Sequence, residues 1–238
     1  TDMEGWTDLR LITIDLDDTV WPCAPVIREA EAAHYAWLAA QAPRLTAAHD
    51  AESLRSHRRE LMRQRPEIAH DVTALRRTAL QQLLIAHQYP AELADGALEV
   101  FRRARNRVEP YADVMPVLQR LRRHYKLVSI TNGNAEVHET ALRDRFDHCL
   151  TAAEAGAAKP APALFEQAMA WADAAPSESL HIGDDPYLDV EAARAVGIEA
   201  VWINRDARPW PAELAPPRFE AADLDALEAW LGLSVDRE

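Results

Sequence analysis

Two aspartates, Asp15 and Asp17, stand two residues apart in the segment 15–19 (DLDDT), directly after the apolar run 9–14 (LRLITI). The run is short and rich in β-formers, which favours a buried strand that ends at the acidic cluster. This spacing can direct both carboxylates toward one site. One carboxylate can attack phosphorus to form an acyl phosphate, while the other moves a proton. By itself, the segment is also compatible with an acidic turn or a helix cap.

Two further segments carry groups suited to phosphate. Residues 129–134 (SITNGN) end a second apolar run, and their hydroxyl and backbone N–H groups could bind phosphate oxygens, although Asn-Gly is also an ordinary turn signal. Lys159 lies in residues 158–162 (AKPAP), where the prolines favour an extended residue at 159 and a helix just afterward. An ammonium near a helix N-terminus suits a phosphoryl group, whereas an isolated lysine before proline is often only solvated.

A fourth segment, residues 181–189 (HIGDDPYLD), is another apolar run that ends in carboxylates. Its Asp184, together with Asp15, offers the hard oxygen ligands that Mg²⁺ prefers, and substrate phosphate and water can complete the coordination. If the acidic groups of these segments are crowded together, each raises the pKa of the others. A divalent cation and Lys159 would keep them ionised.

The elements that must position these groups alternate between strands and helices. Strands are expected at 9–14, 125–131, 146–150, 179–182 and 198–203, and helices at 114–124, 135–144, 161–172, 188–196 and 224–231. Such alternation indicates a parallel sheet covered on both faces. Ligands bind open parallel sheets beyond the carboxyl ends of the strands, which is where the polar segments are expected.

Residues 22–108 interrupt this alternation, since they show helical periodicity with almost no strand signal. We expect an insertion of about four helices, punctuated near Pro43, Pro66 and Pro90, in a core formed by 1–21 and 109–238. The insertion carries a net charge of +3, which leaves −16 on the remainder. This difference either helps to attract an anionic substrate or reflects solvated helix faces.

Composition excludes several classes of protein. The chain has 238 residues, 48% of them hydrophobic, and a net charge of −13, which opposes binding to nucleic acid or anionic membranes without a strongly segregated basic patch. Its two cysteines, Cys23 and Cys149, form no disulfide framework or metal-ligand pattern. Residues 1–10 do not resemble an export signal, and no apolar run reaches the roughly 20 residues that span a bilayer. We expect a cytoplasmic protein that binds neither nucleic acid nor membrane, with its oligomeric state open.

The four segments together resemble the haloacid dehalogenase superfamily of hydrolases. The matching motifs are DLDDT at 15–19, SITNG at 129–133, KP at 159–160 and GDDPYLD at 183–189, followed by EAARAVG at 191–197. The resemblance implies an α/β fold, a Rossmann-like doubly wound parallel sheet with an inserted all-helical cap. It also implies the phosphatase branch, because true dehalogenases lack an acid at the position of Asp17 and need no metal.

The resemblance assigns the reaction to particular residues. Asp15 is implied to be the nucleophile that forms the aspartyl phosphate, and Asp17 the general acid and base. Thr131 and Asn132 would hold the phosphoryl oxygens. Lys159 would neutralise the charge on the aspartyl phosphate and its transition state.

The same resemblance implies a Mg²⁺ site. Asp15 and Asp184 would bind the metal by their side chains, and Asp17 by its carbonyl oxygen. Asp185 and Asp189 would orient the metal-bound waters and Lys159.

A finer resemblance concerns the substrate. DLDDTVWP, SITNGN and PYADV resemble bacterial phosphatases of small metabolites, including those of the riboflavin pathway and of FMN. In the insertion, Arg76 is a candidate for binding a second anionic or polar group of the substrate, or else forms a surface salt bridge. Trp21 and Tyr187 could stack on a planar substrate or simply pack.

The motifs leave two alternatives to a phosphatase open. One is a phosphomutase of the same superfamily, which passes the phosphoryl group to a sugar rather than to water. The other is a non-catalytic protein that binds a phosphorylated metabolite.

Overall fold

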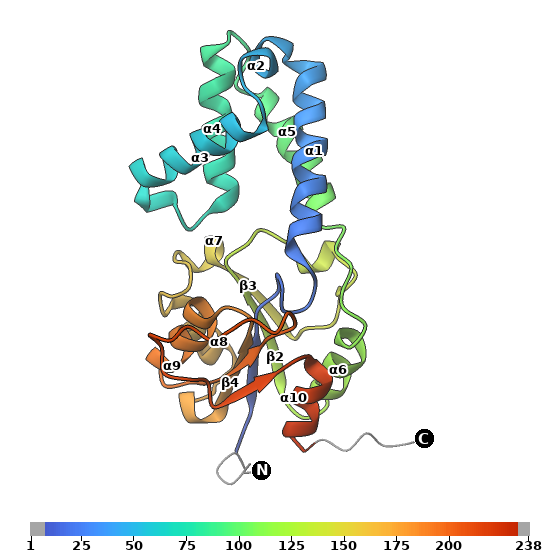
Figure 1. Ribbon diagram of the computed structural model, residues 1–238, viewed down its shortest axis with the longest axis vertical. Helices are drawn as coiled ribbons and strands as arrows, with labels where there is room; N and C mark the ends of the chain where they lie inside the picture. Colours follow the sequence, from blue (N-terminus) through green and yellow to red (C-terminus); the bar gives the residue numbers. More distant parts are fainter. Residues whose placement is uncertain (1–7, 233–238) are drawn as a thin grey trace. The chain divides into compact units, whose positions relative to one another are not determined.

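The computed structural model describes residues 8–232, which fold into two compact units (Figure 1). The sheet unit contains the chain up to Pro22, Glu109–Asn132 and the residues from Leu142 on, and the helical unit contains Cys23–Val108 with Gly133–Ala141. The expected insertion, 22–108, did not include the last of these segments. It joins the helical unit because Glu136 accepts hydrogen bonds from Arg102 and Asn106, at 2.8 and 2.9 Å.

The sheet unit is built on six parallel strands in the order β3-β2-β1-β4-β5-β6, which confirms the expected Rossmann-like doubly wound sheet. The strands are β1 Leu11–Ile14, β2 Lys126–Thr131, β3 His148–Thr151, β4 Ser179–Gly183, β5 Glu199–Ile203 and β6 Phe219–Ala221. The sequence patterns predicted the first five with small differences in their ends. They missed β6, whose three residues give too short a run to be recognised.

The central strands bring their carboxyl ends to one edge of the sheet. All four residues of β1 are buried, as expected for a strand covered on both faces. Ile14 pairs with Ser129 of β2 and with Ile182 of β4. The residues that follow β1 and β4 therefore emerge side by side, where the strand order reverses.

Helices cover both faces of this sheet. They are α6 Val114–Leu121, α7 Ala152–Ala155, α8 Ala163–Ala172, α9 Ala192–Ala195 and α10 Leu224–Trp230. Figure 1 shows α8 and α9 on one face and α6 and α10 on the other. On the first face, Leu164 and Phe165 of α8 pack in one buried cluster with Leu11 and Val128.

Two expected helices of the sheet alternation differ in the structure. The stretch 135–144 forms only a 3-10 turn at Val137–Glu139, because Glu136 is extended and its N–H donates to the Asn106 side chain. The stretch 188–196 begins as a π-helical segment at Pro186–Glu191 (η4), which continues directly into α9.

The helical unit has five α-helices where about four were expected. They are α1 Cys23–Gln41, α2 Pro43–Ala48, α3 Ala51–Gln64, α4 Val72–Ala86 and α5 Leu93–Arg105, with a 3-10 turn at Pro66–Ile68. The additional helix is the short α2, which Pro43 begins. Asp50 and Asp71 cap α3 and α4 with their side chains.

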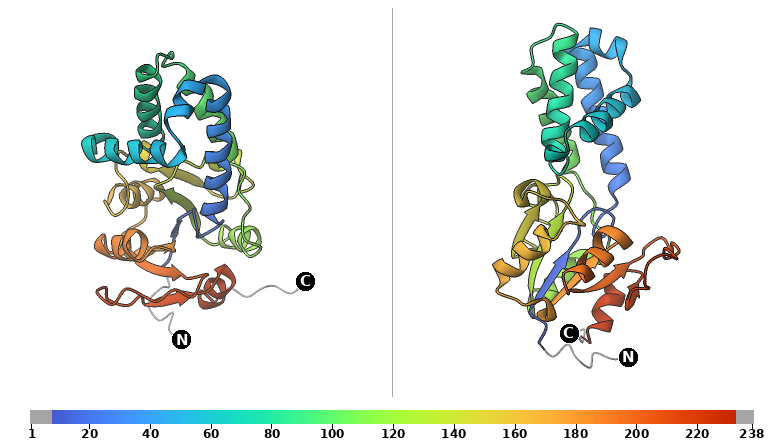
Figure 2. Two further views of the ribbon diagram at one scale, coloured as in Figure 1. Left: turned by 45° about the horizontal axis from the view of Figure 1, so that its top comes forward. Right: turned by 90° about the vertical axis from the view of Figure 1, so that its left-hand side faces the viewer.

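Helices α1 and α5 pack closely side by side, as Figures 1 and 2 show. Gly96 of α5 permits the close approach, because a Cβ there would lie 2.4 Å from the Trp37 ring. His34 of α1 is buried against α5, with its Nδ1 3.0 Å from the carbonyl oxygen of Ala97. Within residues 8–232, no helix is both long enough and apolar enough to cross a bilayer.

We predict that His34 makes the protein less stable in mild acid. Burial lowers the pKa of His34 from 6.5 to about 4. As the pH falls from 6.5 toward 4, the unfolded chain takes up a proton at this residue and the folded chain does not, so the free energy of unfolding falls. The expected loss is about 2 kcal/mol between pH 7.5 and 5.

Urea unfolding at these two pH values, followed by circular dichroism, measures the loss. His34→Gln should reduce the difference between the two pH values by about that amount. His138→Gln, at an exposed position of the same unit, is the matched control and should leave it unchanged. An unaltered pH dependence in His34→Gln would contradict the prediction.

Candidate active site at the carboxyl ends of the strands

Asp15 and Asp184 meet at the edge where β1 and β4 end. Asp15 directly follows β1, and Asp184 directly follows β4. The Thr19 hydroxyl lies 3.2 Å from an oxygen of each carboxylate. Burial and repulsion from Asp189 raise the pKa of Asp15 well above its usual value, and burial raises the pKa of Asp184 to about 6. A cation bound beside them would favour the charged form of both carboxylates.

Lys159 supplies one positive charge to this site. Its Nζ lies 3.0 Å from Asp15 Oδ1 and 2.7 Å from Asp189 Oδ1, and all three side chains are buried. Burial alone would lower the pKa of Lys159, but attraction to Asp15 and Asp189 raises it. Burial alone would raise the pKa of Asp189, but attraction to Lys159 and the hydrogen bond with His181 lower it. Both groups are thus charged, and the ammonium is directed at Asp15.

His181 of β4 contacts Asp189. Its Nε2 lies 2.8 Å from Asp189 Oδ1, and its Nδ1 lies 2.8 Å from the Thr13 hydroxyl. Burial lowers the pKa of His181, so the ring is neutral. Since an ionised Asp189 can only accept, Nε2 carries the proton and Thr13 donates to Nδ1.

Neither His181 nor Thr13 was assigned a role from the sequence. His181 belongs to the segment 181–189 and therefore lay within a recognised motif. Its partner Thr13 comes from a different strand, β1, 168 residues away along the chain. Only the pairing of β1 with β4 brings the two together.

Asn132 fixes the backbone of Lys159. Its side-chain oxygen accepts from the Lys159 N–H at 2.8 Å, and its amide nitrogen donates to the Lys159 carbonyl at 2.9 Å. The side chain of Asn132 thus holds Lys159, and the expected binding of phosphoryl oxygens by Asn132 stays a prediction. The helix expected at residue 161 begins at Ala163, so Lys159 is positioned by Asn132 rather than by a helix N-terminus. Thr131 is buried at the end of β2.

Asp17 is held within its own loop by Trp21. The indole Nε1–H of Trp21 donates to Asp17 Oδ1 at 2.9 Å, and the Trp21 side chain is fully buried. Trp21 therefore packs and orients Asp17 rather than presenting a face for stacking. Arg205, which the sequence patterns did not single out, donates to the carbonyl of Thr19 at 3.0 Å and supports this loop.

Asp185 caps the segment that follows it and supports Asp189. Its carboxylate oxygen Oδ1 accepts from the N–H groups of Tyr187 and Leu188, both at 2.8 Å. Its own N–H donates to Asp189 Oδ2 at 3.0 Å. The expected role of Asp185 in orienting metal-bound waters and Lys159 stays a prediction. Tyr187 is exposed, and its hydroxyl bonds to Glu213.

The acidic groups suit a hard divalent cation. Among the residues that the structure describes, Asp15, Asp184 and Asp189 bring carboxylate oxygens within 4.8 Å of one another. Asp189 already accepts from Lys159, His181 and the backbone of Asp185. Asp15 and Asp184 are thus the carboxylates left for a metal, and carboxylate oxygens are the ligands that a hard divalent cation prefers. A contribution from the Asp17 carbonyl stays a prediction.

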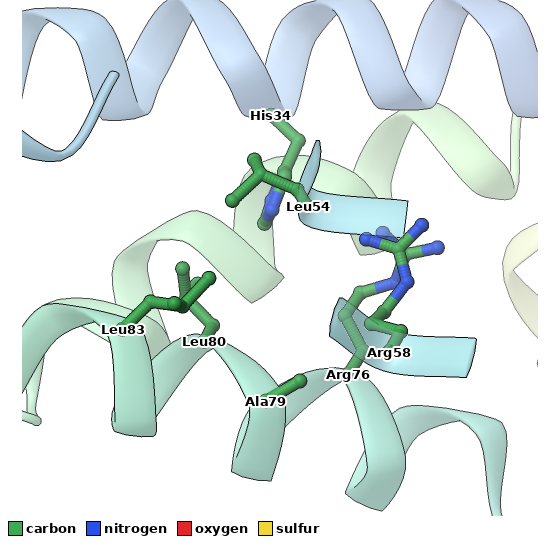
Figure 3. Close-up of a pocket in the computed structure, with 7 residues that line it drawn as sticks. All are labelled: His34, Leu54, Arg58, Arg76, Ala79, Leu80 and Leu83. Carbon is green, nitrogen blue, oxygen red and sulfur yellow. The ribbon is translucent and has the colours of Figure 1, made fainter. Parts of the chain in front are cut away.

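Arg76, the candidate for substrate binding in the insertion, lies inside the helical unit. Its guanidinium is 2.9 Å from Glu31 and 3.8 Å from the centre of the Phe101 ring, and only 12% of its side chain is exposed. Arg58 approaches the same Glu31 oxygen at 3.0 Å. Figure 3 shows the two arginines among the residues that line a small pocket. The volume of this pocket is about 10 Å³, enough for about one water molecule. Arg76 thus forms an ion pair with Glu31, which was the alternative to substrate binding. The pair is buried and does not lie on the surface as that alternative expected.

Comparison with known proteins identifies relatives along almost the whole chain. Residues 9–197 match the family of haloacid dehalogenase-like hydrolases. The 5-amino-6-(5-phospho-D-ribitylamino)uracil phosphatase YigB of Escherichia coli is 31% identical over 216 residues, which cover 87% of this chain and 90% of the relative. A phosphoserine phosphatase of Thermus thermophilus is 34% identical over 154 residues, 62% of this chain and 60% of the relative.

A solved structure also matches closely. A 2-haloacid dehalogenase from Pseudomonas syringae pv. tomato DC3000 superimposes with a TM-score of 0.89 and is 38% identical. The match covers 94% of this chain and 98% of the other. The relatives thus include both phosphatases and a protein described as a dehalogenase.

We predict that Gly183→Ala disrupts the site from within the sheet. A Cβ at residue 183 would lie 2.2 Å from Asp189 Cγ, so Asp189 must move away from Lys159 and His181. Overpacking of this kind destabilises by about 1–3 kcal/mol, which urea unfolding would measure. Gly156→Ala is the control, because a Cβ at residue 156 would contact no other atom. This substitution should lower the free energy of unfolding by only about 1 kcal/mol, since alanine is strained at the φ of 84° found there. Wild-type stability in Gly183→Ala would contradict the prediction.

Proposed function

The chain belongs to the family of haloacid dehalogenase-like hydrolases, and we propose that it is a Mg²⁺-dependent phosphatase of small phosphomonoesters that forms an aspartyl phosphate on Asp15. One observation carries the proposal. The buried Lys159 ammonium lies 3.0 Å from Asp15, while a second carboxylate, Asp17, is oriented from the same loop by Trp21. This arrangement supports the proposal, because it offers groups suited to nucleophilic attack, charge neutralisation and proton transfer.

Asp15 and Asp17 divide the reaction between them. An oxygen of Asp15 attacks phosphorus, and the bond from phosphorus to the leaving alcohol oxygen breaks as Asp17 donates a proton to that oxygen. Asp17 then takes a proton from water, which attacks the same phosphorus and releases inorganic phosphate. Asp15 is regenerated as a carboxylate, and Asp17 is again protonated.

The surrounding residues keep the nucleophile in place and offset charge. Lys159 orients Asp15 and offsets the negative charge that gathers on the phosphoryl group. Asp189, held by His181, keeps the ammonium directed at Asp15. Mg²⁺ bound by Asp15 and Asp184 would supply the second positive charge against the anionic substrate. Thr131, at the end of β2, would contribute to phosphoryl binding, and Asn132 contributes by holding Lys159.

We further propose that the substrate is a phosphate of the riboflavin pathway or FMN, and that the protein acts in the cytoplasm. The support is the similarity to the riboflavin-pathway phosphatase along 87% of this chain. An anionic metabolite is also compatible with the charge of residues 22–108. These residues carry a net charge of +3, whereas the rest of the chain carries −16.

A second candidate function is dehalogenation, which the 38% identity to a 2-haloacid dehalogenase favours. Halide leaves without a proton, so this reaction needs no acid at the leaving group. Here Asp17 occupies that position and is held by the buried Trp21. The presence of this carboxylate favours the phosphatase.

We expect phosphate release from a panel of FMN, riboflavin-pathway phosphates, sugar phosphates and p-nitrophenyl phosphate with Mg²⁺, and little with EDTA. Asp15→Asn should lower turnover at least about 1,000-fold, because it removes the nucleophile. Asp18→Asn is the matched control, since this exposed neighbour has a φ of 64° that asparagine tolerates. Phosphate release that survives Asp15→Asn would overturn the assignment of the nucleophile.

Other outcomes identify the alternatives. Halide release from a 2-haloacid that persists in Asp17→Asn, without phosphatase activity, would show a dehalogenase. Conversion of a sugar 1-phosphate to the 6-phosphate without free phosphate would show a mutase. Tight binding of an unchanged phosphoester would show a non-catalytic binding protein.

We predict that His181 is a positioning residue that acts through Asp189 and Lys159. His181→Leu should lower kcat about 10- to 100-fold with little change in KM, because Asp189 loses one of its three donors. His181→Gln can place an amide N–H near the position of Nε2, so it should recover much of the rate. Steady-state kinetics on the best substrate measures both variants. The role would be contradicted if His181→Leu and His181→Gln lowered kcat equally while both variants were as stable as the wild type.

A further inference from the structure

A groove of about 410 Å³ lies at the opposite end of the sheet from the candidate active site. Arg10 precedes β1, Lys126 begins β2, and Arg122 and Arg123 follow the end of α6. This volume lies within the range of small-molecule sites. The groove is formed entirely by residues of the sheet unit.

The groove concentrates positive charge in an otherwise acidic unit. Among the described residues, four Arg and Lys side chains and His124 line it, against a single carboxylate, Asp147. An adjoining hollow of about 330 Å³ shares Arg122, Arg123 and Asp147 and adds one cation, Arg145, and one carboxylate, Asp144. The parts of the chain outside residues 22–108 carry −16, so this local excess of cations is strongly segregated.

Two of these cations have no carboxylate partner among the residues that the structure describes. Arg122 pairs with Asp147 at 2.9 Å, and Arg10 is 3.6 Å from Glu178. Within residues 8–232, neither Arg123 nor Lys126 has a carboxylate within 4.0 Å, and Lys126 donates only to a backbone carbonyl, that of Ala172. The groove therefore offers charge to a ligand.

The groove is separate from the catalytic site. Arg10 and Asp15 lie at opposite ends of β1, five residues apart, which corresponds to about 16 Å along an extended strand. A small ligand held by Arg10 and Lys126 would not reach Asp15. Occupation of the groove is thus independent of the proposed phosphatase reaction.

We propose that this groove binds a small polyanion with two or more phosphate groups in a chain. Guanidinium groups match phosphate oxygens in geometry and charge, and cations from three elements spread over the groove favour several phosphates rather than one. The Trp171 ring on its wall is already stacked on His148, with a centroid separation of 4.8 Å, and Lys126 lies 5.6 Å from its centroid. Recognition therefore rests on charge rather than on stacking of a base.

Calorimetric titration with inorganic tripolyphosphate at low ionic strength tests the site. Asp15→Asn protein without added Mg²⁺ prevents turnover. Arg123→Gln with Lys126→Gln should weaken binding at least about 10-fold, since two charged contacts are lost. The matched control is Arg28→Gln with Arg63→Gln, which removes the same charge from exposed positions of the helical unit and should change the affinity less than about two-fold.

Further probes distinguish the sources of the anion. Equal affinity for tripolyphosphate and ATP would show that the phosphate chain is recognised, whereas tighter binding of ATP would identify a nucleotide site. The proposal is overturned if tripolyphosphate does not bind in the low millimolar range, or if it binds the groove variant as well as the control. It is also overturned if a single-stranded oligonucleotide displaces tripolyphosphate from the groove, because that would indicate a nucleic-acid surface.

Discussion

The buried contact of Lys159 with Asp15 and Asp189 is the interaction on which the rest of the site depends. An ammonium taken out of water is costly unless carboxylates and hydrogen bonds compensate it, and removing one partner leaves an uncompensated buried charge. Each neighbour serves this contact. Asn132 fixes the backbone of Lys159, His181 holds Asp189, and Gly183 leaves the space that Asp189 occupies.

The same contact leaves carboxylates that suit the proposed cation. One ammonium faces several carboxylates, and burial together with repulsion from Asp189 raises the pKa values of Asp15 and Asp184. Asp189 is committed to Lys159, which leaves the other two carboxylates to a metal. A cation bound to these two carboxylates would allow a phosphate ester to bind at an acidic cluster that would otherwise repel it.

The two ends of the sheet carry side chains of opposite charge. Carboxylates gather at the carboxyl ends of β1 and β4, whereas arginine and lysine gather at the amino ends of β1 and β2. The helical unit has an interior of its own, in which Arg58 and Arg76 share Glu31 beside a water-sized cavity. A net charge of −13 alone reveals none of this distribution.

The sequence by itself determined the parallel α/β fold, the helical insertion and the segments that form the site, because strand and helix periodicity and short motifs are local properties. Five strands and the positions of Asp15, Lys159 and Asp184 could be predicted in this way. Tertiary structure alone decided which side chains face each other: Thr13 with His181, Asn132 with Lys159 and Arg76 with Glu31. These pairs join residues 27 to 168 positions apart, and no local pattern encodes a contact whose geometry arises only when the elements pack.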